Sequence, residues 1–302
     1  MRAVDGVNLQ LKTGDTLGLV GESGCGKSQA VLAMLGLLDR NGQVWGSACY
    51  RGQELIGLKE SALNRVRGAK ITMIFQDPMT ALNPHLKVGT QLLEVLRQHA
   101  RLPGKAARQH AIDWLAAVQL PDPARLMQRY PHELSGGQRQ RVMIAMSLLC
   151  EPEILIADEP TTALDVTVQA GILQLLRELR RRLRMALILI THDLGLVAGI
   201  CERVMVLYAG RVVESGPTAA VFHQPQHPYT RGLLACMPRL NTPFEQRLPT
   251  IAGRPPVIGQ RPAGCSFAPR CSYAFTRCEH ESPQLVALDP VRAKACHLER
   301  LP

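Results

Sequence analysis

Residues 21–28 read Gly-Glu-Ser-Gly-Cys-Gly-Lys-Ser and fit the pattern G-x-x-x-x-G-K-S/T. They follow an apolar run of strand length, Leu17 to Val20, and precede a stretch with helical spacing, Gln29 to Leu38. Glycines at such positions let backbone N–H groups wrap a phosphate chain, and the N-terminus of the next helix favours an anion. Lys27 would reach the β- and γ-phosphates, and Ser28 could ligate Mg²⁺. The sequence therefore predicts a nucleotide site made of Gly21, Glu22, Ser23, Gly24, Cys25, Gly26, Lys27 and Ser28.

Apolar runs of strand length recur along the chain, with helical patterns between several of them: Leu17 to Val20, Ile71 to Phe75, Ile154 to Ala157, Ala186 to Ile190 and Val204 to Tyr208. This alternation predicts an α/β fold with a parallel sheet covered by helices. From Leu86 to Gln140 the apolar spacing is helical throughout, which indicates an inserted helical subdomain at about residues 86–147. Prolines recur after about residue 222 and break regular patterns. We expect one domain over residues 1–224 and a loop-rich extension over residues 225–302.

The composition is that of a globular protein, with 302 residues, 46% hydrophobic and 20% charged. No window approaches the roughly 18 consecutive apolar residues of a membrane span, and the N-terminus lacks the apolar segment of a secretory signal. We therefore expect a cytoplasmic protein. The net charge is +10. Its Arg-rich run, Arg177 to Arg184, is more typical of a solvated helix face than of a nucleic-acid surface.

A second element of phosphate chemistry lies at Ile154 to Glu159, an apolar run that ends in two carboxylates. Downstream of a phosphate loop, this pattern predicts Asp158 beside the Mg²⁺ and Glu159 facing the attacking water.

Leu134 to Gln138 reads Leu-Ser-Gly-Gly-Gln, and by this signature the chain resembles the ABC ATPase family. The signature opens a helical stretch, Arg139 to Leu149, so its hydroxyl and N–H groups would lie at a helix N-terminus that suits a γ-phosphate. The resemblance implies that two ATPase subunits sandwich ATP head to tail. Four residues would then act on the partner's ATP: Ser135, Gly136, Gly137 and Gln138.

Further segments resemble the same family in the same order. Phe75 to Pro78 contains Gln76 of the Q-loop, Ala163 to Asp165 is the D-loop with Asp165, and His192 is the switch histidine. The resemblance implies that Glu159 is the general base and that Gln76 and His192 position water, phosphate and metal. The implied Mg²⁺ ligands are Ser28, Gln76 and Asp158. Family members also carry an aromatic residue that stacks on adenine just before the point where this sequence starts, so either the start codon is assigned too late or purine affinity is reduced.

Two longer stretches, residues 75–84 and residues 225–230, resemble the ATP-binding subunits of dipeptide and oligopeptide importers. That likeness implies two transmembrane permease subunits, a second ATPase subunit, related or identical, and a peptide-binding protein. It also implies a peripheral position on the cytoplasmic face of the inner membrane. Related subunits serve nickel, glutathione, opines or oligosaccharides, so the cargo rests on resemblance alone.

The extension carries four clustered cysteines, Cys265, Cys271, Cys278 and Cys296. Such thiols suit a 4Fe–4S cluster or a tetrahedral Zn²⁺, and unligated thiols are a third possibility. The spacing lacks the C-x₂-C pairs of zinc ribbons. In the peptide-importer subunits that the chain resembles, four such cysteines can hold an iron–sulfur cluster, which we therefore expect here.

ABC ATPases that work on DNA or ribosomes share the phosphate loop and the signature, and a basic protein would suit them. They carry long coiled coils or zinc inserts, or two ATPase units, whereas this chain has a short insert and one unit. We therefore expect no nucleic-acid partner.

Overall fold

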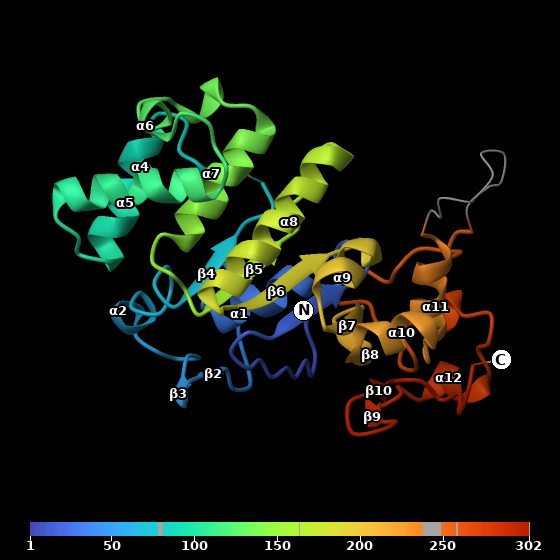
Figure 1. Cartoon of the computed structure of the whole chain (residues 1–302). Helices are drawn as coiled ribbons and strands as arrows, with labels where there is room; N and C mark the ends of the chain where they lie inside the picture. Colours follow the sequence, from blue (N-terminus) through green and yellow to red (C-terminus); the bar gives the residue numbers. More distant parts are fainter. Residues whose placement is uncertain (78–80, 163, 238–248, 258, 302) are drawn as a thin grey trace. The chain divides into compact units, whose positions relative to one another are not determined.

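The computed structural model describes residues 1–77, 81–162, 164–237, 249–257 and 259–301 (Figure 1). The chain forms two compact units. The first comprises Met1–Leu11, Thr16–Leu32 and Leu189–Pro302, and the second comprises Lys12–Asp15 and Ala33–Ile188. Helix α1 (Lys27–Met34) and strand β6 (Ala186–Thr191) each contribute residues to both.

The second unit is built on β4 (Ile71–Ile74) and β5 (Ile154–Asp158), which pair in parallel, with the first residues of β6 next to β5. Nearly every residue of these strands is buried, as expected for parallel strands covered on both faces. Every regular element from Val88 to Leu148 is a helix, and side chains such as Leu92 and Leu115 form the fully buried core of these helices. The helices formed by the described residues of this unit are α2 (Glu60–Leu63), α4 (Val88–His99), α5 (Gly104–Ala117), α6 (Pro123–Leu126), the 3-10 helix η1 (Pro131–Glu133), α7 (Gly136–Leu148) and α8 (Val166–Leu183). A small hairpin joins β2 (Cys49–Tyr50) to β3 (Gln53–Glu54).

The first unit contains β1 (Thr16–Val20), which lies between the end of β6 and β7 (Arg203–Tyr208) and pairs with β7 in parallel. Strand β8 (Arg211–Pro217) returns antiparallel to β7 through Ala209 and Gly210, whose φ values of 48° and 78° suit a tight hairpin turn. Strand β10 (Ala293–Lys294) pairs with β8 and with β9 (Val286–Ala287), both antiparallel. Besides most of α1, the described residues of this unit form the helices α9 (Leu194–Ile200), α10 (Thr218–His223), α11 (Pro228–Ala235), the 3-10 helix η2 (Ala268–Arg270) and α12 (Thr276–His280).

The predicted α/β class is confirmed, and the five predicted strands agree with β1, β4, β5, β6 and β7 to within one residue at each end. The expectation that prolines break every regular pattern in the extension is wrong at Pro228. This residue begins α11, because a proline at the first helical position loses no helical hydrogen bond. Strand β10 also joins the extension to the sheet of the first unit. In the part of the chain that the structure describes, every helix is too short or too polar to cross a membrane.

Candidate nucleotide-binding and hydrolysis site

The predicted phosphate loop connects the fully buried strand β1 to the start of α1. The side chain of Lys27 turns back into the loop, where its Nζ donates hydrogen bonds to the carbonyl oxygens of Gly21, at 2.8 Å, and Glu22, at 3.1 Å. Lys27 is only 5% exposed. The loop therefore holds one cation against its own backbone, next to the helix N-terminus, as phosphate binding requires.

Two glycines of the loop lie where a side chain could not. A Cβ atom on Gly21 would come within 2.2 Å of the carbonyl oxygen of Leu207 in β7. A Cβ atom on Gly26, whose φ is +101°, would come within 2.9 Å of the carbonyl oxygen of Ala3. The loop is thus packed directly against the backbone of β7 and of the N-terminal segment.

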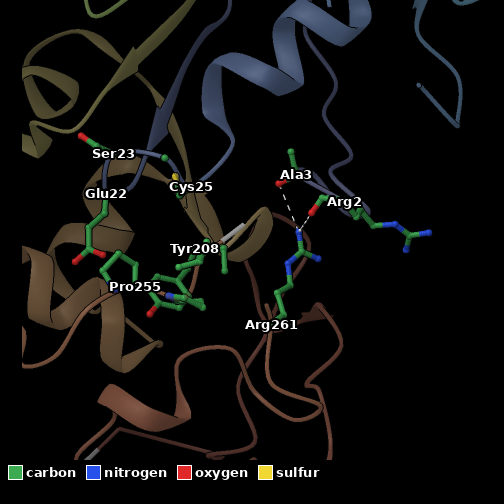
Figure 2. A pocket seen from close by; sticks show the side chains of 12 residues that line it. Arg2, Ala3, Glu22, Ser23, Cys25, Tyr208, Pro255 and Arg261 are labelled. Atoms are coloured by element: carbon green, nitrogen blue, oxygen red, sulfur yellow. Dashed lines mark hydrogen bonds between the residues drawn. The ribbon is translucent and has the colours of Figure 1, made fainter. Parts of the chain in front are cut away.

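A cavity of about 240 Å³ lies beside this loop (Figure 2). Its walls include Glu22 to Cys25 from the loop, Tyr208 from β7 and Pro255 from the extension. Arg261 closes another side by donating to the carbonyl oxygen of Arg2, at 3.1 Å, as Figure 2 shows. Burial raises the pKa of the Cys25 thiol, which favours its neutral form.

His192 belongs to the first unit and is exposed, directly after the last residue of β6. The turn that carries it is held on both sides. The N–H group of Asp193 donates to Thr191 Oγ1 at 3.0 Å, and Asp193 Oδ1 accepts from the N–H group of Gly195 at the start of α9, at 2.7 Å. The backbone at His192 is therefore fixed by its neighbours.

In the second unit, Gln76 and Glu159 are brought together. Strands β4 and β5 are in register with Ile74 opposite Ala157, so the residues two positions further on also face each other. Gln76 Nε2 donates to Glu159 Oε2 at 3.0 Å. Asp158, the last residue of β5, is only 5% exposed.

The backbone of Glu159 has a φ of 46°, an uncommon conformation for a residue with a side chain. Thr162 Oγ1 also donates to Glu159 Oε2, at 2.9 Å. Two donors therefore orient one carboxylate oxygen at a strained position, which is typical of functional sites. Thr162 was not among the residues predicted from the sequence.

The signature residues form the beginning of α7 in the second unit. Ser135 is the N-cap, where its Oγ accepts from the N–H group of Gln138 at 3.3 Å while its own N–H group donates to Gln138 Oε1 at 3.1 Å. Gly136 and Gly137 form the first turn, and a Cβ atom on Gly137 would lie 3.1 Å from the side chain of Val168. The helix N-terminus predicted here is present.

Asp165 is the N-cap of α8, and its Oδ1 accepts from the N–H group of Val168 at 3.0 Å. Other members of two predicted motifs, Ala163 of the D-loop and Pro78, Met79 and Thr80 after Gln76, lie outside the described residues.

The four cysteines of the extension lie in one region of the first unit. The N–H group of Cys265 donates to the carbonyl oxygen of Cys278 at 2.8 Å. Burial raises the pKa of Cys265, Cys271 and Cys296, and the neighbouring cysteines raise it further. Among the residues that the structure describes, however, no three His, Cys, Asp or Glu side chains are grouped so as to hold a metal ion. The expected iron–sulfur or zinc site is therefore not supported by this geometry.

The fold and these motifs define an ATPase of the ABC type. Residues 4–162 match the family described as ABC transporter, and residues 213–278 match the family described as oligopeptide/dipeptide transporter, C-terminal region. The chain therefore belongs to the ABC transporter family, as one of its ATP-hydrolysing subunits of the peptide-importer type.

Individual relatives agree with this assignment. The chain is 53% identical to the oligopeptide transport ATP-binding protein OppD of Salmonella typhimurium, over 97% of this chain and 87% of that protein. It is 52% identical to a putative peptide import ATP-binding protein of Brucella abortus, over 98% of this chain and 89% of that protein. Among solved structures, the ATP-binding cassette MJ0796, a dimer bound to ADP and Pi in a post-hydrolysis state, has a TM-score of 0.64 and 31% identity. That match covers 72% of this chain and 90% of the cassette.

Proposed function

We propose that this chain hydrolyses ATP to drive the import of dipeptides and oligopeptides by a membrane complex. The observation that carries the proposal is the pairing of two family regions in one chain, the ABC transporter region over residues 4–162 and the peptide-transporter C-terminal region over residues 213–278. The relatives described above are named as oligopeptide transport and peptide import proteins, which adds support for this cargo.

In the proposed reaction Glu159 accepts a proton from the water that attacks the γ-phosphate. The two hydrogen bonds to its Oε2, from Gln76 and Thr162, support this role because they orient the carboxylate. Lys27 binds the β- and γ-phosphates, and His192 contacts the γ-phosphate from its turn after β6.

Ser28, Gln76 and Asp158 are the proposed ligands of Mg²⁺. Their fit rests on donor chemistry, since a hydroxyl at the start of α1, an amide oxygen and a nearly buried carboxylate are the hard oxygen donors that Mg²⁺ prefers. The ion would neutralise the charge that develops on the phosphate oxygens.

We further propose that the active unit is a pair of ATPase subunits, in which Ser135, Gly136, Gly137 and Gln138 bind the partner's ATP and Asp165 lies at the shared interface. Support comes from the N-terminal position of these residues on α7, because helix N-termini bind phosphate. The dimeric cassette bound to ADP and Pi is a related precedent. The partner is a second copy or a related subunit.

The proposed complex contains two transmembrane permease subunits and a peptide-binding protein, and this chain lies on the cytoplasmic face of the inner membrane. Residues 1–224 would be the ATPase domain and residues 225–302 the importer-type extension. The helical subdomain, at about residues 86–147, would receive the permease.

For the four cysteines, we keep the 4Fe–4S cluster as a proposal, with Zn²⁺ as its alternative. It is supported by the gathering of Cys265, Cys271, Cys278 and Cys296 in one region and opposed by their lack of ligand geometry. Anaerobic purification followed by iron, sulfide and zinc analysis decides between them. A protein with none of these elements, unchanged in Cys271→Ser, would leave unligated thiols.

The experiment for the main proposal compares ATP hydrolysis by the assembled complex containing wild-type chain, Glu159→Gln or Glu178→Gln. Glu178 is an exposed carboxylate of α8 and serves as the matched control. We expect Glu159→Gln to lower kcat by about 100-fold or more and the control to match wild type. Peptide-loaded binding protein should stimulate the wild type. ATP turnover that responds only to DNA or ribosomes, or a fully active Glu159→Gln variant, would contradict the proposal.

A further inference from the structure

The second residue of the phosphate loop, Glu22, is held by the C-terminal extension through both its side chain and its backbone. Arg270 reaches the carboxylate with two hydrogen bonds, from Nη1 to Oε2 at 2.7 Å and from Nη2 to Oε1 at 2.9 Å. The N–H group of Glu22 donates to the hydroxyl of Tyr229 at 2.9 Å. Figure 2 shows the Glu22 side chain directed toward Pro255 of the extension. These contacts join residues that lie more than 200 positions apart in the sequence.

Arg270 is immobilised on several sides, and its side chain is only 5% exposed. Its Nε donates to the carbonyl oxygen of Ala252 at 2.9 Å, and Nη1 also donates to the hydroxyl of Tyr208 at 3.3 Å. The guanidinium lies over the rings of Tyr208 and Phe267, 5.7 and 5.9 Å from their centroids. Hydrogen bonding to Glu22 raises the pKa of Arg270, which favours the charged guanidinium. A bidentate pair of a guanidinium and a carboxylate is strong and has a specific geometry.

Tyr229 is equally fixed. It is fully buried, with its ring 4.6 Å from that of Tyr208 and 5.4 Å from that of Phe267. The start of its helix is held by Glu214, which is buried and accepts from the N–H groups of Gln226 at 2.7 Å and His227 at 3.0 Å. The Tyr229 hydroxyl is therefore held in one position, where it accepts the hydrogen bond from the N–H group of Glu22 in the phosphate loop.

The charge of Glu22 gives these contacts a consequence for ATP. A carboxylate in a loop that binds polyphosphate repels its ligand unless a cation neutralises it. Arg270 supplies that cation, and together with Tyr229 it keeps the Glu22 carboxylate and amide engaged with the extension.

We propose that Arg270 and Tyr229 are positioning residues for ATP binding, which act through Glu22 by neutralising its charge and fixing the shape of the phosphate loop. The C-terminal extension is then part of the nucleotide site and not a separate appendage.

The test measures KM for ATP and kcat of the assembled complex without peptide, so that failure to import peptide does not affect the result. Arg270→Gln leaves the Glu22 carboxylate unpaired and should raise KM about ten-fold, with kcat changed less than about two-fold. Because the cause is charge, the increase should shrink at high ionic strength. Adding Glu22→Gln removes the unpaired charge, so the double variant should return most of the way to the wild-type KM.

Arg277→Gln is the matched control, since Arg277 forms an exposed ion pair with Glu281 in the same extension. It should leave KM unchanged. A purely structural role for Arg270 predicts a lower melting temperature with KM unaffected, or a double variant no better than Arg270→Gln. Either result overturns the proposal.

Two milder variants keep the test decisive if Arg270→Gln fails to assemble. Arg270→Lys keeps the charge but loses the planar fork, and should raise KM less than the loss of charge does. Tyr229→Phe removes only the hydroxyl and should raise KM by about two- to three-fold, without salt dependence. A wild-type KM in both would refute the inference.

Discussion

Replacing Gly21 by alanine offers a direct measure of how tightly the phosphate loop is packed on β7. The added Cβ atom would lie 2.2 Å from the carbonyl oxygen of Leu207, a backbone atom of a buried strand that cannot move aside cheaply. Overpacking of this kind costs about 3 kcal/mol or more. Gly24 is the matched control, because its φ is +77° but a Cβ atom there would meet nothing within 4 Å. Gly24→Ala therefore carries only the backbone penalty of about 1–2 kcal/mol.

For a chain of this size, 1 kcal/mol lowers the melting temperature by about 2 °C. Gly21→Ala should therefore melt about 6 °C below wild type and Gly24→Ala about 2–4 °C below it. Thermal unfolding of the purified chain without nucleotide, followed by circular dichroism, measures the difference. Equal melting temperatures for the two variants, or a larger loss for Gly24→Ala, would refute the argument that β7 limits the space at Gly21.

Three further predictions concern other parts of the site and its support. Thr162→Val removes one of two donors to Glu159 Oε2 and should lower kcat about ten-fold with KM for ATP unchanged, as steady-state kinetics of the complex would show. Ser135→Ala removes the N-cap side chain of α7, which should lower the melting temperature of the chain by about 2 °C. If Ser135 acts on the partner's ATP, the same variant should also lower the ATPase activity of the complex by about 100-fold. Burial lowers the pKa of His227 to about 3, below its unfolded value of about 6.5, so the unfolded chain takes up a proton that the folded chain does not. The free energy of unfolding therefore falls by up to about 1.4 kcal/mol per pH unit as the pH drops from about 6.5 toward about 3. His227→Asn, which keeps an acceptor for the N–H group of Tyr229, should flatten this decline in urea unfolding midpoints.

The parts of the site that follow from the sequence are those fixed by local pattern and by sheet geometry. Strands β4 and β5 could be predicted as buried strands of one parallel sheet. Their pairing, which brings Gln76 to Glu159, comes from the structure. The sequence also predicted that the signature opens a helix, although the structure starts α7 at Gly136 and not at Arg139. Thr162 was missed because a hydroxyl three residues after the base has no periodic signal of its own.

The contacts of the extension could not be predicted in this way. Tyr229 lies in the importer-like stretch of residues 225–230, and Arg270 lies between Cys265 and Cys271. Neither pattern predicts that both residues contact Glu22. Hydrophobic periodicity reports which face of an element is buried, but it carries no information on which distant element covers that face. The many prolines of the extension predicted a loop-rich segment and gave no sign of its tertiary contacts. These contacts are made by aromatic rings and ion pairs and not by long helices or strands.

This arrangement also decides how the extension can be studied. Tyr208 of β7, Tyr229 of α11 and Phe267 pack against one another and are 1%, 0% and 4% exposed, so the extension completes a hydrophobic core and does not merely lie on one. Deleting residues 225–302 would expose Tyr208 at the end of β7, next to the turn through Ala209 and Gly210 that the phosphate loop contacts. Loss of ATPase activity after such a deletion would therefore reflect a damaged core and could not be assigned to Glu22. Single substitutions that keep the aromatic rings, such as Tyr229→Phe and Arg270→Lys, separate loss of the contacts to Glu22 from damage to the core. They change the hydrogen bonds to the phosphate loop and leave the packed rings in place.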